Sequence, residues 1–179
     1  MNIIKKNKKN TKTKVVAKAS SKAKIRRTKV EIDGIVFDSK MESNYYLKLK
    51  DDLANNRIKG FSLQPEFILQ EKFIIVEGRV VYGSDADFNK LKRKYKAETV
   101  RQIKYTGDFL IEELDGSFKV VETKGLSTPE FEIRKKLFQC KYPMYSLEIL
   151  IFDDKSKTWI DYYKHKKEKN SRKKKSSKK

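Results

Sequence analysis

Two acidic residues and one lysine near the middle of the chain have the types and spacing needed to bind a divalent metal ion against a phosphate. Residues 105–125 read as two strands joined by a turn, with Asp108 on the first strand and Glu122 and Lys124 on the second. Because side chains alternate between the two faces of a strand, Glu122 and Lys124 are expected to share one face. Two carboxylates beside an ammonium group are a poor sheet surface but a good site for a hard cation such as Mg²⁺, which leaves further positions to water and phosphate.

The turn decides whether Asp108 joins the other two side chains, because a one-residue change of register moves a side chain to the opposite face. A two-residue turn would place Asp108 opposite Thr123. A three-residue loop over residues 114–116, with Gly116 in the left-handed conformation, places Asp108 opposite Glu122 instead. We expect the three-residue loop or an equivalent bulge.

The composition excludes several other chemistries. The chain has one cysteine, Cys140, and one histidine, His165. An internal disulfide, a cysteine-based zinc cluster, a histidine-dependent triad and a histidine–metal nuclease motif are therefore excluded. Any hydrolytic chemistry has to rest on carboxylates and lysines.

The charge predicts the kind of partner. A formal net charge of +20 over 179 residues favours a polyanion, either nucleic acid or an anionic membrane face. No segment approaches the ~18 to 20 apolar residues of a membrane span, and the N-terminus lacks the apolar core of a signal peptide. We therefore expect a soluble protein that is not secreted by that route and that binds nucleic acid rather than membrane.

One folded domain is expected between two basic tails. Residues 1–28 are rich in Lys, Asn, Ser and Thr, and residues 164–179 are mostly Lys and Ser. Blocks of like charge without apolar partners cannot offset the entropy of ordering, so both tails are predicted to be disordered. The domain then covers residues 29–163. Within it, the segment from about 73 to 100 reads as an insertion that forms a hairpin and a basic helix, which is either a solvated surface or a clamp on DNA.

The remaining patterns predict the elements around the site. We expect a small hairpin over 30–37, a helix from Ser39 to just before Gly60, a strand over 61–69, a helix from Pro129, a buried strand over 146–152 and an edge strand or short helix over 159–163. Pro65 cannot donate to a ladder, which places it at an edge or a bulge. The resulting order is α-β-β-β-α-β, an α/β fold with helices flanking a mixed sheet.

These pieces resemble a known family. Gly-Asp-Phe, a hairpin and Glu-Thr-Lys-Gly resemble the Asp…(Asp/Glu)-x-Lys signature of the PD-(D/E)XK, or restriction-endonuclease-like, nuclease superfamily, and more closely a phage-encoded branch known as a domain of unknown function. In that branch a Ser-Lys-x-Glu helix start, a Gln-Pro strand, a Tyr-x-x-Asp-Phe strand, a Glu-x-Lys-Gly strand and a Lys-rich helix follow in order. Here they stand at 39–42, 64–65, 105–109, 122–125 and 134–136. The resemblance spans roughly residues 30–152, and Gly107 departs from the proline of the superfamily name.

The resemblance implies a restriction-endonuclease-like core and a Mg²⁺-dependent endonuclease, with Mn²⁺ as a substitute, that cleaves DNA in the cytoplasm of a phage-infected or lysogenic host. It implies a role for eight residues. Asp108 and Glu122 hold the metal with the Thr123 carbonyl as a further ligand, Lys124 orients the attacking water, Glu42 holds a second ion or a water, and Gln64, Arg134 and Lys135 contact water or phosphate.

Alternatives stay open at this point. One is a Holliday-junction resolvase-type activity, for which a homodimer is expected. Another is a non-catalytic basic nucleic-acid-binding protein, whose acids form surface salt bridges worth only ~0 to 1 kcal/mol each. Glu42 also has a structural interpretation, in which it accepts from the Ser39 amide as part of a capping box at the start of the helix.

Overall fold

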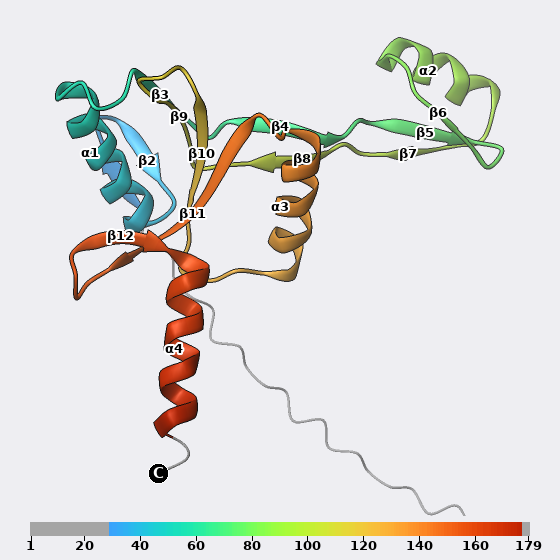
Figure 1. Cartoon of the computed structure of the whole chain (residues 1–179). Coiled ribbons are helices and arrows are strands. Elements are labelled where there is room, and N and C mark those ends of the chain that lie inside the picture. Colours follow the sequence, from blue (N-terminus) through green and yellow to red (C-terminus); the bar gives the residue numbers. More distant parts are fainter. Residues whose placement is uncertain (1–28, 177–179) are drawn as a thin grey trace, which may run out of the picture.

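The computed structural model describes the backbone of residues 29–176 and the side chains of residues 29–171. The predicted disorder of residues 1–28 lies outside these described residues. Figure 1 shows a sheet with helices on both faces, and a long arm of strands that leaves the sheet and carries a helix at its far end.

Five strands form the central sheet, in the order β12, β11, β10, β9, β3. They are β3 (Gly60–Leu63), β9 (Phe109–Glu112), β10 (Phe118–Thr123), β11 (Tyr145–Asp153) and β12 (Thr158–Asp161). Strands β10 and β11 are parallel and the other neighbours are antiparallel. With α1 (Lys40–Ala54) before β3 and α3 (Pro129–Lys141) between β10 and β11, the predicted α-β-β-β-α-β order and the mixed α/β class are confirmed.

Helices α1 and α3 cover opposite faces of the sheet (Figure 1). Val121 of β10 packs with Tyr45 and Leu49 of α1, whereas the adjacent Val120 packs with Phe138 of α3. Both valines are fully buried. The alternation of a strand therefore divides β10 between two apolar layers, and its even-numbered residues face α3.

The connection from β9 to β10 is the predicted three-residue loop. The Glu113 N–H donates to the Ser117 carbonyl at 2.9 Å, which leaves residues 114–116 outside the ladder. Gly116 has φ +86°, the left-handed conformation that glycine adopts without a Cβ penalty. The turn thus fixes the register of the hairpin as expected.

The strands predicted over 61–69 and 105–113 are each broken in two. The outer halves are β4 (Glu66–Gln70) and β8 (Ile103–Thr106), which pair with each other in a separate two-stranded sheet. The interruption falls at Gln64 and Pro65 on one strand and at Gly107 and Asp108 on the other. Across it, the Gln64 N–H donates to the Asp108 carbonyl at 2.9 Å and the Gly107 N–H to the Pro65 carbonyl at 3.1 Å. Pro65, expected at an edge or a bulge, lies in this interruption between β3 and β4, and the register is the same on both sides of it. The continuous strands predicted over 61–69 and 105–113 are not found.

The interrupted strands keep the same pairing register on both sides of the interruption, but their side chains face different helices. Leu63 pairs with Phe109 before the interruption and Phe67 pairs with Tyr105 beyond it. The first pair packs in the α1 layer and the second in the α3 layer. The ribbon therefore rotates at the interruption, and the sheet forks there into the central sheet and the arm.

The arm contains the segment predicted as an insertion. Beyond β4 and β8 it continues as β5 (Phe73–Val76) and β7 (Ala97–Val100), with β6 (Arg79–Val81) and α2 (Asp85–Lys94) at its far end (Figure 1). Ser84 and Asp87 form a full capping box at the start of α2. Phe88 of α2 packs on Ile74 of β5 in a small core of its own. The predicted hairpin and helix are both present.

Gly107 is required by a close approach at the fork. A Cβ atom at this position would lie 2.6 Å from Cγ1 of the fully buried Val120. We expect Gly107→Ala to lower the free energy of unfolding by about 1–3 kcal/mol, because the core has to move to admit the methyl group. Urea denaturation measures this loss. Gly60→Ala is the matched control, since nothing lies within 4 Å of its added Cβ, and equal losses in the two variants would contradict the interpretation.

The C-terminal lysine-rich segment differs from its prediction. Disorder was expected from residue 164, but α4 (Tyr162–Ser176) continues directly from β12. The Asp161 carboxylate accepts the Lys164 N–H at 2.7 Å and so caps the first turn. Lysine is a good helix former, and no glycine or proline follows Tyr145 in the sequence. The cap and these propensities outweigh the repulsion on which the prediction rested.

The expected N-terminal hairpin is present as β1 (Val30–Ile32) and β2 (Ile35–Phe37). Ile35 and Phe37 pack against α1 and close the α1 layer near the fork. Among the described helices, none is both long enough and apolar enough to cross a membrane.

Candidate active site

Asp108 and Glu122 meet where the sheet forks. Asp108 immediately precedes β9, and its N–H donates to the Val121 carbonyl at 3.1 Å. Because Phe109 pairs with Val121, the same register places Asp108 beside Glu122 of β10. The structure therefore places Asp108 opposite Glu122, in the register that the three-residue loop was expected to give.

The Asp108 carboxylate is oriented by Thr123. Its Oδ2 atom accepts hydrogen bonds from the Thr123 N–H at 2.7 Å and from the Thr123 hydroxyl at 2.8 Å. Within the described part of the chain, Oδ1 accepts no hydrogen bond. One oxygen is thus fixed by the protein, and the other is left for a ligand.

Glu122 and Lys124 form a largely buried ion pair on the α3 side. Glu122 is 8 % exposed, and its Oε1 atom lies 2.5 Å from Nζ of Lys124. The Tyr105 hydroxyl lies 3.4 Å from the other oxygen, Oε2. The Lys124 ammonium also lies 3.6 Å from the centroid of the Phe131 ring. Both side chains are therefore held in place by packing as well as by charge.

Burial and mutual repulsion disfavour the ionised forms of the two acids. Burial raises the pKa of Asp108 to about 7, and repulsion from Glu122 acts in the same direction, against the Thr123 hydrogen bonds. Burial also raises the pKa of Glu122, although the hydrogen bond from Lys124 opposes the shift. Two carboxylates are thus held close together in a place where both are costly to ionise.

Glu42 and Gln64 share a small cavity with Asp108. The cavity has a volume of about 100 Å³ and is otherwise lined by apolar side chains of β2, β3 and β9. Burial raises the pKa of Glu42, and Asp108 adds to the shift by repulsion. The structure therefore places these two predicted residues on the side of Asp108 that faces α1.

The Glu42 carboxylate forms only part of a capping box at the start of α1. The Ser39 hydroxyl accepts the Glu42 N–H at 3.2 Å and donates to Glu42 Oε1 at 2.8 Å. The bond from the Ser39 amide that a full capping box requires is absent among the described residues. The purely structural interpretation thus explains one carboxylate oxygen of Glu42, a residue that also lines the cavity beside Asp108.

Gln64 adopts a strained backbone conformation. Its φ is +48°, which is uncommon for a residue with a side chain and is further disfavoured before Pro65. Such strain is typical of functional sites, where the surrounding structure enforces it. Here the hydrogen bond from the Gln64 N–H to the Asp108 carbonyl enforces it and ties the two residues together.

Arg134 and Lys135 are not brought to the carboxylates in the same way. The Lys135 ammonium donates to the Tyr163 hydroxyl at 2.7 Å and pairs with Glu132 at 2.9 Å. Lys135 therefore links α3 to α4. Arg134 instead lines a groove beside the arm.

Tyr105 was left without a role by the sequence. It is 2 % exposed, packs against Phe131 and Phe138, and presents its hydroxyl to Glu122. The rotation at the fork brings Tyr105 into the α3 layer, and a continuous strand does not predict this. Its place in the Tyr-x-x-Asp pattern was the only signal in the sequence.

Asp108 and Glu122 could supply two of the oxygen ligands of one hard cation. Among the described residues, no three His, Cys, Asp or Glu side chains gather closely enough to hold a metal ion by themselves. Two carboxylates are nevertheless sufficient for Mg²⁺, which usually keeps several waters and binds through one or two carboxylates plus substrate phosphate. The raised pKa values of Asp108 and Glu122 are what such a pair shows before a cation neutralises it.

Comparison with known proteins identifies the family to which the chain is similar. The family model described as "Protein of unknown function (DUF1064)" matches residues 22–161, a range that includes all eight predicted site residues. No curated protein and no solved structure matches the chain.

Proposed function

This chain belongs to the family of proteins of unknown function DUF1064, and we propose that it is a metal-dependent nuclease that hydrolyses phosphodiester bonds in DNA. The observation that carries the proposal is the pairing of Asp108 with Glu122 at the fork, with Lys124 bonded to Glu122. The α-β-β-β-α-β order and the forked sheet support membership of the PD-(D/E)XK superfamily, where the same three residue types are used. Its place of action would be the cytoplasm of a phage-infected or lysogenic host.

The buried acids support a metal site better than a structural salt-bridge cluster. A cluster that served stability alone would not place Glu42, Asp108 and Glu122 where burial and mutual repulsion raise the pKa of each acid, with a lysine bonded to only one of them. Unpaired buried charge is costly, so this arrangement weakens the fold unless a cation compensates it. Strain at Gln64 and the close contact at Gly107 add to the cost of building the fork.

The residues divide the chemistry among them. A divalent ion held by Asp108 and Glu122, with the Thr123 carbonyl as a further ligand, would neutralise phosphate charge and lower the pKa of bound water. Thr123 holds Asp108 Oδ2 and so aims Oδ1. Lys124, kept in place by Glu122 and Phe131, orients the attacking water and stabilises the charge that builds on phosphorus.

Glu42 and Gln64 would act from the opposite side of Asp108. Their cavity is large enough for a few waters and lies next to the carboxylate. Glu42 would accept a proton from a water there, or hold a second ion. Gln64 would hydrogen-bond the same water or a phosphate oxygen.

A non-catalytic nucleic-acid-binding protein is the second candidate. It is favoured by the net charge of +20 and by the lack of a three-ligand metal cluster among the described residues. A resolvase-type activity is a narrower form of the first proposal and would require a homodimer. The experiment below separates these possibilities.

The test compares three substrates with the purified full chain: linear duplex DNA, single-stranded DNA and a four-way junction. We expect cleavage with Mg²⁺ or Mn²⁺, none with EDTA, and none with Glu122→Gln, whose shape is nearly unchanged. Preference for the junction, with paired cuts, would favour the resolvase. Failure to cut any substrate would reject the nuclease and leave the binding protein. Equal cutting by Glu122→Gln would reject the assignment of the cleavage site to this residue.

A further inference from the structure

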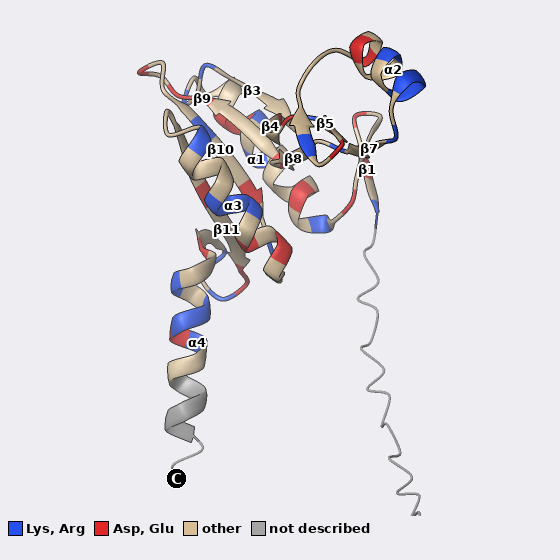
Figure 2. Ribbon diagram, turned by 90° about the vertical axis from the view of Figure 1, so that its right-hand side faces the viewer, with Lys and Arg blue, Asp and Glu red and all other residues tan. Residues whose placement is uncertain are grey.

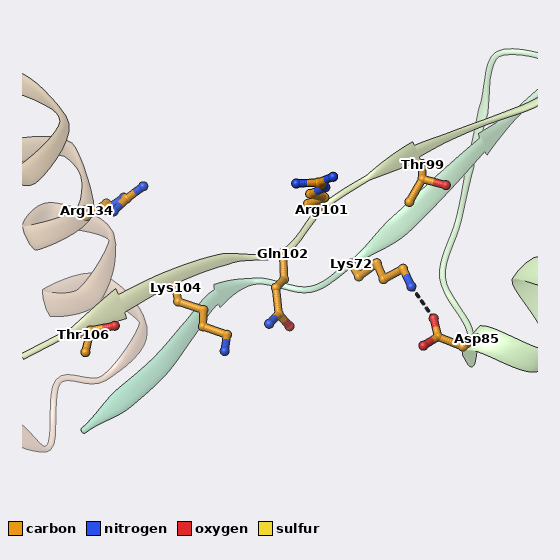
Figure 3. A pocket seen from close by; sticks show the side chains of 8 residues that line it. All are labelled: Lys72, Asp85, Thr99, Arg101, Gln102, Lys104, Thr106 and Arg134. Atoms are coloured by element: carbon orange, nitrogen blue, oxygen red, sulfur yellow. Dashed lines mark hydrogen bonds and ion pairs between the residues drawn. The ribbon is translucent and has the colours of Figure 1, made fainter. Parts of the chain in front are cut away.

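A basic groove runs along the base of the arm. It has a volume of about 680 Å³. Figure 3 shows side chains of residues 99–106 along the path from β7 to β8, with Arg134 on α3 and with Lys72 and Asp85 on neighbouring segments. Besides Asp85 and Thr99, the groove is lined by Lys72, Arg101, Gln102, Lys104, Thr106 and Arg134. None of them belongs to the carboxylate site.

Two positive charges in the groove lack an acidic partner. Lys72 pairs with Asp85, and Lys104 pairs with Glu66 at 2.7 Å. Arg101 and Arg134, in contrast, have no carboxylate within 4.0 Å among the described residues, and both are exposed. The Arg134 charge acts on Glu130, one turn earlier on α3, without forming an ion pair. Guanidinium groups bind phosphate through paired N–H donors, so two arginines that line one groove without an ion pair favour a phosphate-bearing ligand.

The groove begins beside the candidate active site. Thr106 is the last residue of β8 and is followed in the chain by Gly107 and Asp108. Arg134 lies about one helical turn beyond Phe131, whose ring contacts the Lys124 ammonium. A polymer whose scissile phosphate lay at the carboxylates would therefore lead its neighbouring phosphates into the groove.

The arm has the length to follow a duplex. From β4 to the end of β5 its strand covers residues 66–76, which extends roughly 35 Å at the rise of a β-strand. This is about one turn of double-stranded DNA. The α2 helix at the far end presents exposed Lys90, Lys92, Arg93 and Lys94 (Figure 2).

We propose that this groove binds the sugar-phosphate backbone of duplex DNA next to the scissile phosphate, and that the arm follows the duplex for about one turn. The inference rests on the proposed function, which identifies the polymer as DNA. It adds that the DNA is double-stranded and that the duplex runs from the carboxylates along the arm. Arg101 and Arg134 contact phosphates near the cut, Gln102 and Thr106 supply neutral hydrogen bonds, and the lysines of α2 meet the backbone at the far end. The contacts are independent of base sequence.

The test measures binding without cleavage. Affinity for a duplex of about three helical turns is measured in EDTA over a range of salt concentrations, for the full chain and for Arg101→Ala/Arg134→Ala. Each lost phosphate contact lowers the slope of log Kd against log salt by about one, so we expect the slope to fall by about two. Lys136→Ala/Lys155→Ala is the matched control, because it removes the same charge from exposed lysines outside the groove.

Equal slopes for the two double variants would overturn the proposal. So would equal sensitivity of single-stranded DNA to Arg101→Ala/Arg134→Ala, because the groove would then not select a duplex. Matching thermal unfolding curves ensure that altered binding is not lost folding. The assay needs no metal, so it is independent of cleavage. A protein that shows the slope change but never cuts DNA would refute the nuclease and support the groove. A protein that cuts DNA but shows no slope change would support the nuclease and refute the groove.

Discussion

Lys124→Met is expected to reduce Mg²⁺-dependent DNA cleavage by about 10²–10³-fold, because it removes a preorganised positive charge from the place where negative charge builds on phosphorus. The methionine side chain keeps most of the packing on Phe131. DNA binding should be almost unchanged, since the charge of +20 supplies most of the affinity. Cleavage rates at saturating DNA and Kd values in EDTA measure the two effects separately.

Lys119→Met is the matched control for this change. Lys119 lies on the same strand and pairs with Glu113 at 2.7 Å and Glu148 at 3.3 Å, but its neighbour Val120 places it on the other face of β10. It should cleave DNA at nearly the rate of the unaltered protein. If both variants lose activity together, the loss reflects a weakened sheet and the role of Lys124 fails.

Asp108→Asn is expected to abolish cleavage and to stabilise the metal-free protein at pH 8. Asparagine keeps an oxygen for the Thr123 hydrogen bonds but removes the charge that Glu122 repels. The melting temperature should rise by several degrees, since each kcal/mol shifts it by roughly 2–4 °C in a chain of this size. Calorimetry in EDTA measures the gain, and added Mg²⁺ should then raise the melting temperature of the unaltered protein only.

The pH dependence of that gain has a fixed sign. The pKa of Asp108 is about 7 in the folded protein against an ordinary value of 3.8, so the folded state holds a proton that the unfolded state has released. Stability from this group is full below pH 4 and is lost as the pH rises toward 7. The advantage of Asp108→Asn should therefore grow between these values and then level off. An advantage that is largest in acid would contradict the arrangement of the two carboxylates.

Local rules predicted the hairpin because they act within a few residues. Gly116 admits the positive φ that a three-residue loop needs, and the register of Asp108 and Glu122 follows from it by counting. The capping residue Ser84 and the apolar repeat of α1 are equally local signals. Where one turn or one cap decides the outcome, the amino-acid pattern is sufficient.

The fork was not predictable because contacts between distant segments create it. Gly107 breaks its strand through its closeness to Val120, and Gln64 is strained by a bond to Asp108. These contacts move Tyr105 into the α3 layer and turn the Asp108 carboxylate toward Thr123. Strand alternation alone placed Asp108 on the same face as Glu122, whereas the structure sets it between the two layers.

The hydrogen bond at Gly107 also explains the departure from the proline in the superfamily name. The Gly107 N–H donates to the Pro65 carbonyl at 3.1 Å, and proline has no N–H to give. This chain thus uses position 107 to close the fork, with the required small residue.

A crystal of the full chain soaked in Mn²⁺ offers the most direct measurement, because anomalous scattering locates this ion without assumptions about activity. We predict one strong peak at coordinating distance from both Asp108 Oδ1 and a Glu122 carboxylate oxygen, and its loss in Glu122→Gln crystals. A map with no peak between these two side chains, while the Glu122–Lys124 pair remains intact, would contradict the existence of a metal site at the fork.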